Sequence, residues 1–181
     1  KLSDKYYQTR IIDFENDRQD RSIYKLFGGS VGIMSNTLNS KQYATGGYQE
    51  SLVAQVYSGK EYYRPGSTDK KQERVNQQHS WLQIGYKREQ YHTLAKKFVL
   101  GWQADALYSS RNFSQNYTAT MMQAGTFSPT AHSKLIYNEA FRANQYFAAG
   151  IKPIFLLSDM LQFRTELYGF FPVFPINKRP D

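Results

Sequence analysis

Apolar and polar residues alternate along the C-terminal part of the chain. Between residues 161 and 171, one set of alternate positions is mostly apolar, and the other set carries Arg164 and Glu166. Alternate side chains of a β-strand leave opposite faces, so this segment can bury one face and keep Arg164 and Glu166 together on the other. A helix would mix the two sets. The pattern therefore predicts a strand with one apolar face and one polar face.

Other segments repeat this period of two. They are residues 23–34, 52–57, 81–88, 98–108 and 146–157. Residues 135–146 fit either a strand face or a helical stripe, and we predict a strand there. Pro153 has no N–H to donate, so we expect it at a bulge or an edge of the sheet.

Polar stretches rich in turn residues separate these segments, at residues 36–49, 64–78, 109–117 and 124–133. The nearly all polar run 13–21 indicates that residues 1–21 form a charged N-terminal segment and that residues 22–181 form the β domain. We predict an all-β fold, an antiparallel meander of about 7–8 strands that forms a barrel or a partial barrel. The wide spacing of the segments implies long strands or long loops.

The composition excludes several classes of protein. The 181 residues carry 23 Lys and Arg against 15 Asp and Glu, and they include 15 Tyr, 12 Phe and no Cys. No window approaches the ~18 consecutive apolar residues of a transmembrane helix. The aromatic content argues against a disordered chain. The lack of Cys removes disulfides, thiolate metal sites and cysteine nucleophiles together.

One local motif fits a serine hydrolase. Gly28-Gly29-Ser30-Val31-Gly32 matches the G-x-S-x-G nucleophile elbow, which requires a strand before the serine and a helix after it. Residues 33–40 lack a helical apolar stripe. We therefore interpret the motif as a strand bent by glycines, and a lipid-ester hydrolase that uses Ser30 is only the third hypothesis.

The remaining candidate chemistry points away from metals and nucleic acids. His79, His92 and His132 lack the spacing of metal ligands, so we predict no metal and no cofactor, and we expect these side chains at the surface or at the edge of a lumen. The basic pairs, such as Lys70-Lys71 and Lys96-Lys97, are short and lie between the predicted strands. We therefore expect no nucleic-acid partner.

Five residues mark the polar face of the predicted strands: Gln103, Asp105, Lys152, Arg164 and Glu166. Burying their charges in a dry core would be costly. The polar face is therefore either an ordinary solvated face of a sheet or the wall of a watery lumen, and the alternation alone leaves both open.

Short motifs near the C-terminus carry a resemblance to a known family. They are Ser128-Pro129-Thr130, His132-Ser133, Phe141-Arg142-Ala143, Gln145-Tyr146, Gly150-Ile151-Lys152-Pro153 and Tyr168-Gly169-Phe170-Phe171-Pro172. With them, residues 124–155 and 161–175 resemble the C-terminal outer-membrane barrel of bacterial patatin-like phospholipases, which is related to the bacterial surface antigen barrels. The family's Ser/Asp dyad precedes its barrel, and this chain has no Asp-Gly partner motif for Ser30. The resemblance therefore implies a partial barrel that is not an enzyme.

These observations lead to one principal expectation and one alternative. We expect a non-catalytic segment of a bacterial outer-membrane barrel, in contact with the lipid bilayer, that anchors or translocates an upstream patatin-like domain. A homo-oligomer is a possible way to supply further strands. The alternative is a soluble β-sandwich or small barrel whose Tyr and Trp side chains bind a carbohydrate or an apolar ligand.

Overall fold

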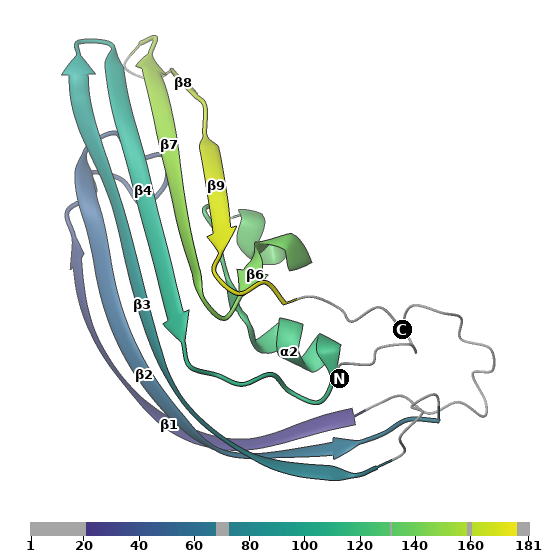
Figure 1. Cartoon of the computed structure of the whole chain (residues 1–181). Coiled ribbons are helices and arrows are strands. Elements are labelled where there is room, and N and C mark those ends of the chain that lie inside the picture. Colours follow the sequence, from purple (N-terminus) through teal and green to yellow (C-terminus); the bar gives the residue numbers. More distant parts are fainter. Residues whose placement is uncertain (1–20, 68–72, 131, 159–160, 177–181) are drawn as a thin grey trace.

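The computed structural model describes residues 21–67, 73–130, 132–158 and 161–176. Seven strands of this part form one antiparallel meander, in the order β1-β2-β3-β4-β7-β8, and β9 also pairs with β7 (Figure 1). The strands are β1 (Arg21–Asn36), β2 (Gly47–Arg64), β3 (Val75–Ala95), β4 (Phe98–Ser109), β7 (Tyr146–Leu156), β8 (Gln162–Arg164) and β9 (Leu167–Pro172). The prediction of an all-β antiparallel meander is confirmed. The predicted N-terminal segment lies almost entirely outside the described residues, since β1 begins at Arg21.

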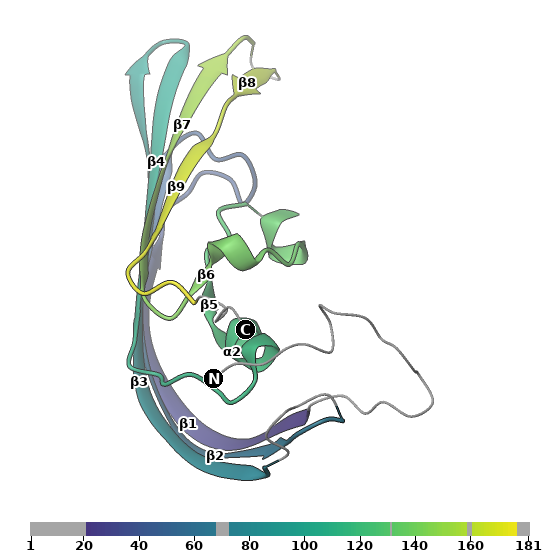
Figure 2. The same ribbon diagram turned by 45° about the vertical axis from the view of Figure 1, so that its right-hand side comes forward.

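The sheet is an open, curved wall. Its two edges are β1 on one side and β8 with β9 on the other, and within the described residues these edges do not pair with each other. Figure 2 shows the wall from the side, with all the helices on its concave side. The described residues therefore form part of a curved sheet and not a closed barrel.

Two strands are much longer than the alternation predicted. β2 has 18 residues and β3 has 21, whereas the predicted segments were 52–57 and 81–88. The extra residues are polar on both faces, as at Gln77 and Gln78, and so have the composition of loops. Cross-strand hydrogen bonds hold them in the sheet nonetheless, with Gln78 paired to Lys60.

The connection between β4 and β7, residues 110–145, folds back onto the concave side of the wall (Figures 1 and 2). We call it the insert. It contains α2 (Tyr117–Gln123), β5 (Gly125–Thr126), η1 (His132–Leu135), η2 (Glu139–Phe141) and β6 (Arg142–Ala143). Asn116 caps α2 by accepting a hydrogen bond from the backbone N–H of Ala119 at 3.1 Å.

The predicted strand over 135–146 is wrong. The stretch begins at the end of the 3-10 helix η1, contains the 3-10 helix η2 and the two-residue strand β6, and reaches the long strand β7 only at Tyr146. Asn138 starts the second helix, because its side chain accepts a hydrogen bond from the N–H of Ala140 at 3.0 Å. Such a local bond from an Asn side chain competes with the hydrogen bonds of a sheet.

The buried apolar residues lie between the wall and the segments that cover its concave side. They form three small clusters: Ala44, Tyr91, Val99 and Ile154; Tyr117, Met121, Ala124 and Ile176; and Phe127, Ala143, Tyr146 and Ala148. The first cluster packs the β1–β2 loop on strands of the sheet, the third packs the insert on β7, and the second joins the insert to the C-terminal stretch without a residue of the sheet. The hydrophobic core is therefore on one side of the sheet only.

Pro153 lies where the edge strand is interrupted. β9 pairs with β7 as far as Leu167 and Ile151, and β8 resumes the pairing at Arg164 and Ile154. Between them, the N–H of Thr165 donates to the carbonyl of Pro153 at 3.1 Å. The break between β8 and β9 is thus next to the residue that has no N–H to offer, in agreement with the expected bulge or edge.

Candidate functional site

The two faces of the sheet differ sharply in exposure. The concave side, toward the insert, is called the inner face, and the opposite side is called the outer face. On β7 the inner residues Ala148, Lys152 and Ile154 are at most 4% exposed. The outer residues Phe147, Ile151 and Phe155 are 45–50% exposed. The strand therefore buries a lysine and exposes two phenylalanines.

Exposed apolar side chains cover the outer face of every strand in the sheet. We call this set the outer band, and its members are 37–75% exposed: Phe27, Val31, Ile33, Leu52, Val56, Leu82, Ile84, Tyr108, Phe147, Ile151, Phe155, Phe163, Leu167 and Phe171. The pairing register puts them all on one face. A contiguous apolar surface of this extent marks a site that meets a membrane or a partner.

Polar residues limit the outer band at both ends of the long strands. On β2 the outward residues Glu50 and Lys60 lie on either side of the stretch from Leu52 to Val56. On β3 the outward residues Gln78 and Arg88 flank the apolar stretch in the same way. The outer face is therefore apolar only in the middle of these strands.

The outer band runs obliquely to the hydrogen-bonded rows. One row joins Ile33, Leu52, Tyr86, Ala106 and Phe147 across five strands. Ile33 is the last apolar outward residue of its stretch on β1, and Phe147 is the first on β7, which runs in the same direction. The apolar stretch thus lies before this row on β1 and after it on β7, a shift of ~20 Å along the strand direction. The five strands span four strand spacings, or ~19 Å, so the band makes an angle of about 45° with the hydrogen-bonded rows.

An aromatic and charged cluster lies at one rim of the outer band. The Arg88 guanidinium lies 5.6 Å from the ring centre of Tyr48 and 5.7 Å from that of Trp102. Its Nη1 is 3.5 Å from Oε1 of Glu50, and the Tyr86 hydroxyl donates to the same oxygen at 2.6 Å. Aromatic rings with polar partners are typical of the boundary between hydrocarbon and water.

The inner face brings three of the five predicted polar-face residues together. Nζ of Lys152 lies 2.7 Å from Oε1 of Glu89, and Nη1 of Arg164 lies 3.7 Å from Oε1 of Glu166. Arg164 also donates through Nη2 to the carbonyl of Ala44 at 2.5 Å, which ties β8 to the β1–β2 loop. The side chains of Lys152, Arg164 and Glu166 line one cavity of about 770 Å³ between this loop and the wall.

The other two predicted residues lie further along the inner face. Oδ2 of Asp105 is 3.0 Å from Nζ of Lys87, and the hydroxyl of Tyr146 donates to Oδ1 of Asp105 at 3.3 Å. Gln103 is 6% exposed, and its Oε1 has no hydrogen-bond partner among the described residues. All five residues thus lie on the inner side of the sheet, toward the insert and the β1–β2 loop.

Two inner tyrosines are positioned by glycines directly opposite them in the register. Tyr91 faces Gly101, and Tyr168 faces Gly150. A Cβ on either glycine would come within 2.5 Å or 2.2 Å, respectively, of the ring. Each ring therefore lies flat over a neighbouring backbone, and only glycine leaves room for it.

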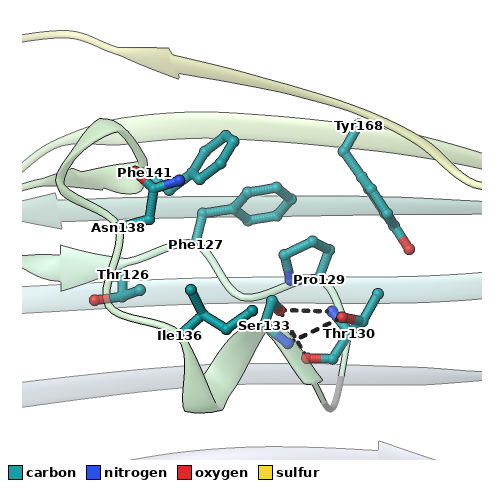
Figure 3. Close-up of a pocket in the computed structure, with 9 residues that line it drawn as sticks. All are labelled: Thr126, Phe127, Pro129, Thr130, Ser133, Ile136, Asn138, Phe141 and Tyr168. Carbon is teal, nitrogen blue, oxygen red and sulfur yellow. Dashed lines mark hydrogen bonds between the residues drawn. The ribbon is translucent and has the colours of Figure 1, made fainter.

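A second, apolar cavity of about 320 Å³ lies between the insert and Tyr168 (Figure 3). Phe127 and Phe141 form one side, with ring centres 6.5 Å apart, and Ile136 and Pro129 extend it. The Tyr168 ring lies across the cavity, 6.0 Å from that of Phe127. Most of the cavity lining thus comes from the insert, in part from the stretch 135–146 for which a strand was wrongly predicted.

A buried carboxylate anchors the insert to the wall, and the sequence analysis missed it. Glu61 is 0% exposed. Its Oε1 accepts from the Ser22 hydroxyl at 3.2 Å, the Tyr24 hydroxyl at 3.0 Å and the backbone N–H of Gln115 at 3.2 Å. Its Oε2 lies 2.8 Å from Nε2 of His79. Glu61 therefore joins three strands and the insert at one point.

Arg111 provides a second anchor beside this carboxylate. Its guanidinium lies 4.5 Å from the ring centre of Trp81 on β3, and its carbonyl accepts from Nδ2 of Asn144 at 3.3 Å. Burial lowers the pKa of the Arg111 guanidinium from its ordinary value. The guanidinium therefore holds the start of the insert against the inner face.

The structure corrects two expectations about single residues. His79 is 3% exposed and sits against Glu61, so the expectation of a histidine at the surface or lumen edge is wrong for this residue. Ser30 lies within β1 opposite Gln55, and the strand continues to Asn36. Ser30 therefore has no elbow and no helix after it, and this supports the interpretation of a glycine-containing strand.

No helix in the described part of the chain is both long enough and apolar enough to cross a membrane. No group of three or more His, Asp or Glu side chains within residues 21–67, 73–130, 132–158 and 161–176 gathers as metal ligands would.

Comparison with family models, curated proteins and solved structures finds no match to this chain.

Proposed function

We propose that this sheet is a lipid-facing wall of a bacterial outer-membrane β-barrel, a non-catalytic segment whose inner face encloses polar and charged residues. The outer band carries the proposal. It is apolar where the strands would cross the hydrocarbon, and Glu50, Lys60, Gln78 and Arg88 bound it where the strands would leave it.

The slope of the outer band supports the same conclusion. Strands of transmembrane barrels are tilted by 35–45° to the barrel axis, so a band parallel to the membrane plane must cross the hydrogen-bonded rows at about that angle. The slope from Ile33 to Phe147 agrees with this value. The 12 residues of β4 and 11 residues of β7 also match the ~9–11 residues that a tilted strand needs to span a bilayer.

The alternative of a soluble sandwich fits the outer face less well. A sandwich packs the apolar face of one sheet against a second sheet at ~10 Å. Among the described residues no second layer covers the outer band, and the insert lies on the inner face. In water, the exposed Phe27, Phe155 and Phe171 would carry an uncompensated hydrophobic cost.

The two open edges set a requirement for this proposal. Unpaired N–H and C=O groups of β1 and β9 would be unsatisfied in hydrocarbon, so further strands must close the barrel. Other parts of the intact protein or a second copy of the chain would supply them. The upstream patatin-like domain, which this wall would anchor or translocate, stays a prediction from the resemblance.

The two tryptophans provide a direct test, because Trp102 is on the outer face and Trp81 is on the inner face. The intact protein is reconstituted into vesicles whose acyl chains carry bromine, which quenches tryptophan fluorescence at short range. Any tryptophan outside the 181 residues is first replaced by phenylalanine, so that Trp81→Phe leaves only Trp102 and Trp102→Phe leaves only Trp81. We expect strong quenching of Trp102 and weak quenching of Trp81.

Equal quenching of the two tryptophans, or none for Trp102, would contradict the membrane assignment. Circular dichroism of both variants controls for folding. A compact monomer that stays in solution without detergent and binds a panel of glycans would favour the soluble alternative instead.

A further inference from the structure

The apolar cavity and the charged cavity on the inner face adjoin each other. Pro129 and Thr130 line both of them. Tyr168 connects them as well: its ring lies against the apolar cavity, and its hydroxyl donates to Oε2 of Glu166, in the charged cavity, at 2.8 Å. A ligand with one apolar end and one polar end could therefore occupy both cavities at once.

The apolar cavity suits a single hydrocarbon chain. Phe127, Phe141, Ile136 and Pro129 are among its lining residues, and its volume of about 320 Å³ is at the lower end of the range for ligand pockets. Figure 3 shows that the nearby hydroxyls of Thr130 and Ser133 are engaged with each other's backbone at 2.8–3.1 Å. Because these polar groups already have hydrogen-bond partners, they do not require polar groups from a ligand.

The charged cavity favours an anionic head group. Glu89 already has Lys152 as its partner, and Glu166 has Arg164. Lys41 also lines this cavity, and it has no ion-pair partner among the described residues. The cavity thus has one uncompensated cation.

We propose that the two cavities form one binding site for a single-chain amphiphile with an anionic head group, a long-chain carboxylate. The chain lies between Phe127, Phe141 and Ile136, and the carboxylate accepts a hydrogen bond from Lys41. This inference does not rest on the proposed membrane role, because every group that it uses is on the inner face, in the insert or in the β1–β2 loop.

The test uses dodecanoate that carries a photoreactive diazirine at the far end of its chain. The intact protein in amphipol is irradiated with this probe, and labelled residues are located by mass spectrometry. We expect labels on residues 127–141 of the insert, and unlabelled dodecanoate should compete for them. Labels only on outer residues such as Ile151 and Phe155 would overturn the proposal, since they would indicate nonspecific contact with the apolar surface.

A matched pair of variants tests the apolar end. Ile136→Trp fills the cavity from its rim and should reduce labelling of the insert at least several-fold, whereas Leu135→Trp changes a neighbour that is 86% exposed and does not line the cavity. Both substitutions are at exposed positions, so neither should prevent folding. Equal labelling of the two variants would overturn the proposal.

The charged end is tested with Lys41→Gln and with dodecanol as a competitor. Loss of one charge-assisted hydrogen bond should weaken binding of dodecanoate about tenfold. Dodecanol, which has no charge, should compete about tenfold more weakly than dodecanoate in the unaltered protein and should not respond to Lys41→Gln. If dodecanol and dodecanoate compete equally, the assignment of an anionic head group is wrong. Quenching of Trp102 by brominated lipid is read separately, so a failure here leaves the membrane proposal standing.

Discussion

The two faces of β7 follow opposite rules of burial. Ile151 on the outer face is 47% exposed, and its neighbour Lys152 on the inner face is 4% exposed. A soluble sheet would bury the isoleucine and leave the lysine in water. The inversion teaches that the charges inside are matched to one another, as Lys152 is to Glu89, whereas the proposed membrane role would give the outer side chains the apolar surroundings that suit them.

The largest expected effect comes from a charge on the outer face. Ile151 lies midway along the apolar stretch of β7. In the proposed membrane arrangement, Ile151→Arg would place a guanidinium at the centre of the bilayer and should destabilise the vesicle-bound protein by ~2–4 kcal/mol. Denaturant unfolding from vesicles gives this value. Leu94→Arg serves as the control, because Leu94 is 60% exposed at the β3–β4 hairpin, beyond the outer band. Equal destabilisation by Ile151→Arg and Leu94→Arg would contradict the proposal that the middle of the outer face has an apolar surrounding.

The intermediate effect comes from removing a carboxylate charge on the inner face, compared with removing one on the outer face. Glu61→Gln replaces one acceptor oxygen by an NH₂ group and leaves buried donors unsatisfied, at a cost of ~1–3 kcal/mol. Glu50→Gln alters a part-exposed pair with Arg88 and should cost less than ~1 kcal/mol. Limited proteolysis sharpens the test, because only Glu61→Gln should speed cleavage within the insert. Similar cleavage in both variants would contradict the role of Glu61 as the anchor.

The smallest expected effect comes from Arg111→Lys. This change keeps a positive charge but loses the flat contact with the Trp81 ring, which should cost about 0.5–1 kcal/mol. Trp81 fluorescence, measured in the Trp102→Phe background, should shift to longer wavelength as water reaches the ring. An unchanged Trp81 spectrum would mean that Arg111 does not hold the insert against β3.

Much of the wall could be predicted from the sequence, because the alternation of apolar and polar residues depends only on neighbouring positions within one strand. Each strand of the main sheet with one apolar face produced a period of two, and the faces assigned to Phe163 and Arg164 agree with the register. The polar ends of β2 and β3 and the helix α2 were not predicted. Their residues carry no apolar stripe, and contacts with distant parts of the chain determine their conformation.

The inner face was only partly predictable for the same reason. Lys152, Arg164 and Glu166 stand out next to apolar neighbours, so their common face could be inferred. Glu61 and Glu89 lie in polar surroundings in the sequence, and only the register brings them to His79 and Lys152. Continuing the alternation past Arg88 would have assigned Glu89 to the inner face, but it could not have identified its partner.

The position of the insert in the meander has a consequence for how such a protein can change. β4 and β7 are hydrogen-bonded neighbours up to the pair Leu107 and Tyr146, so the chain leaves the sheet and rejoins it at adjacent places. In topological terms the whole insert is an enlarged hairpin turn. Evolution or a protein engineer can therefore lengthen, shorten or exchange it without altering the strand order that surrounds it.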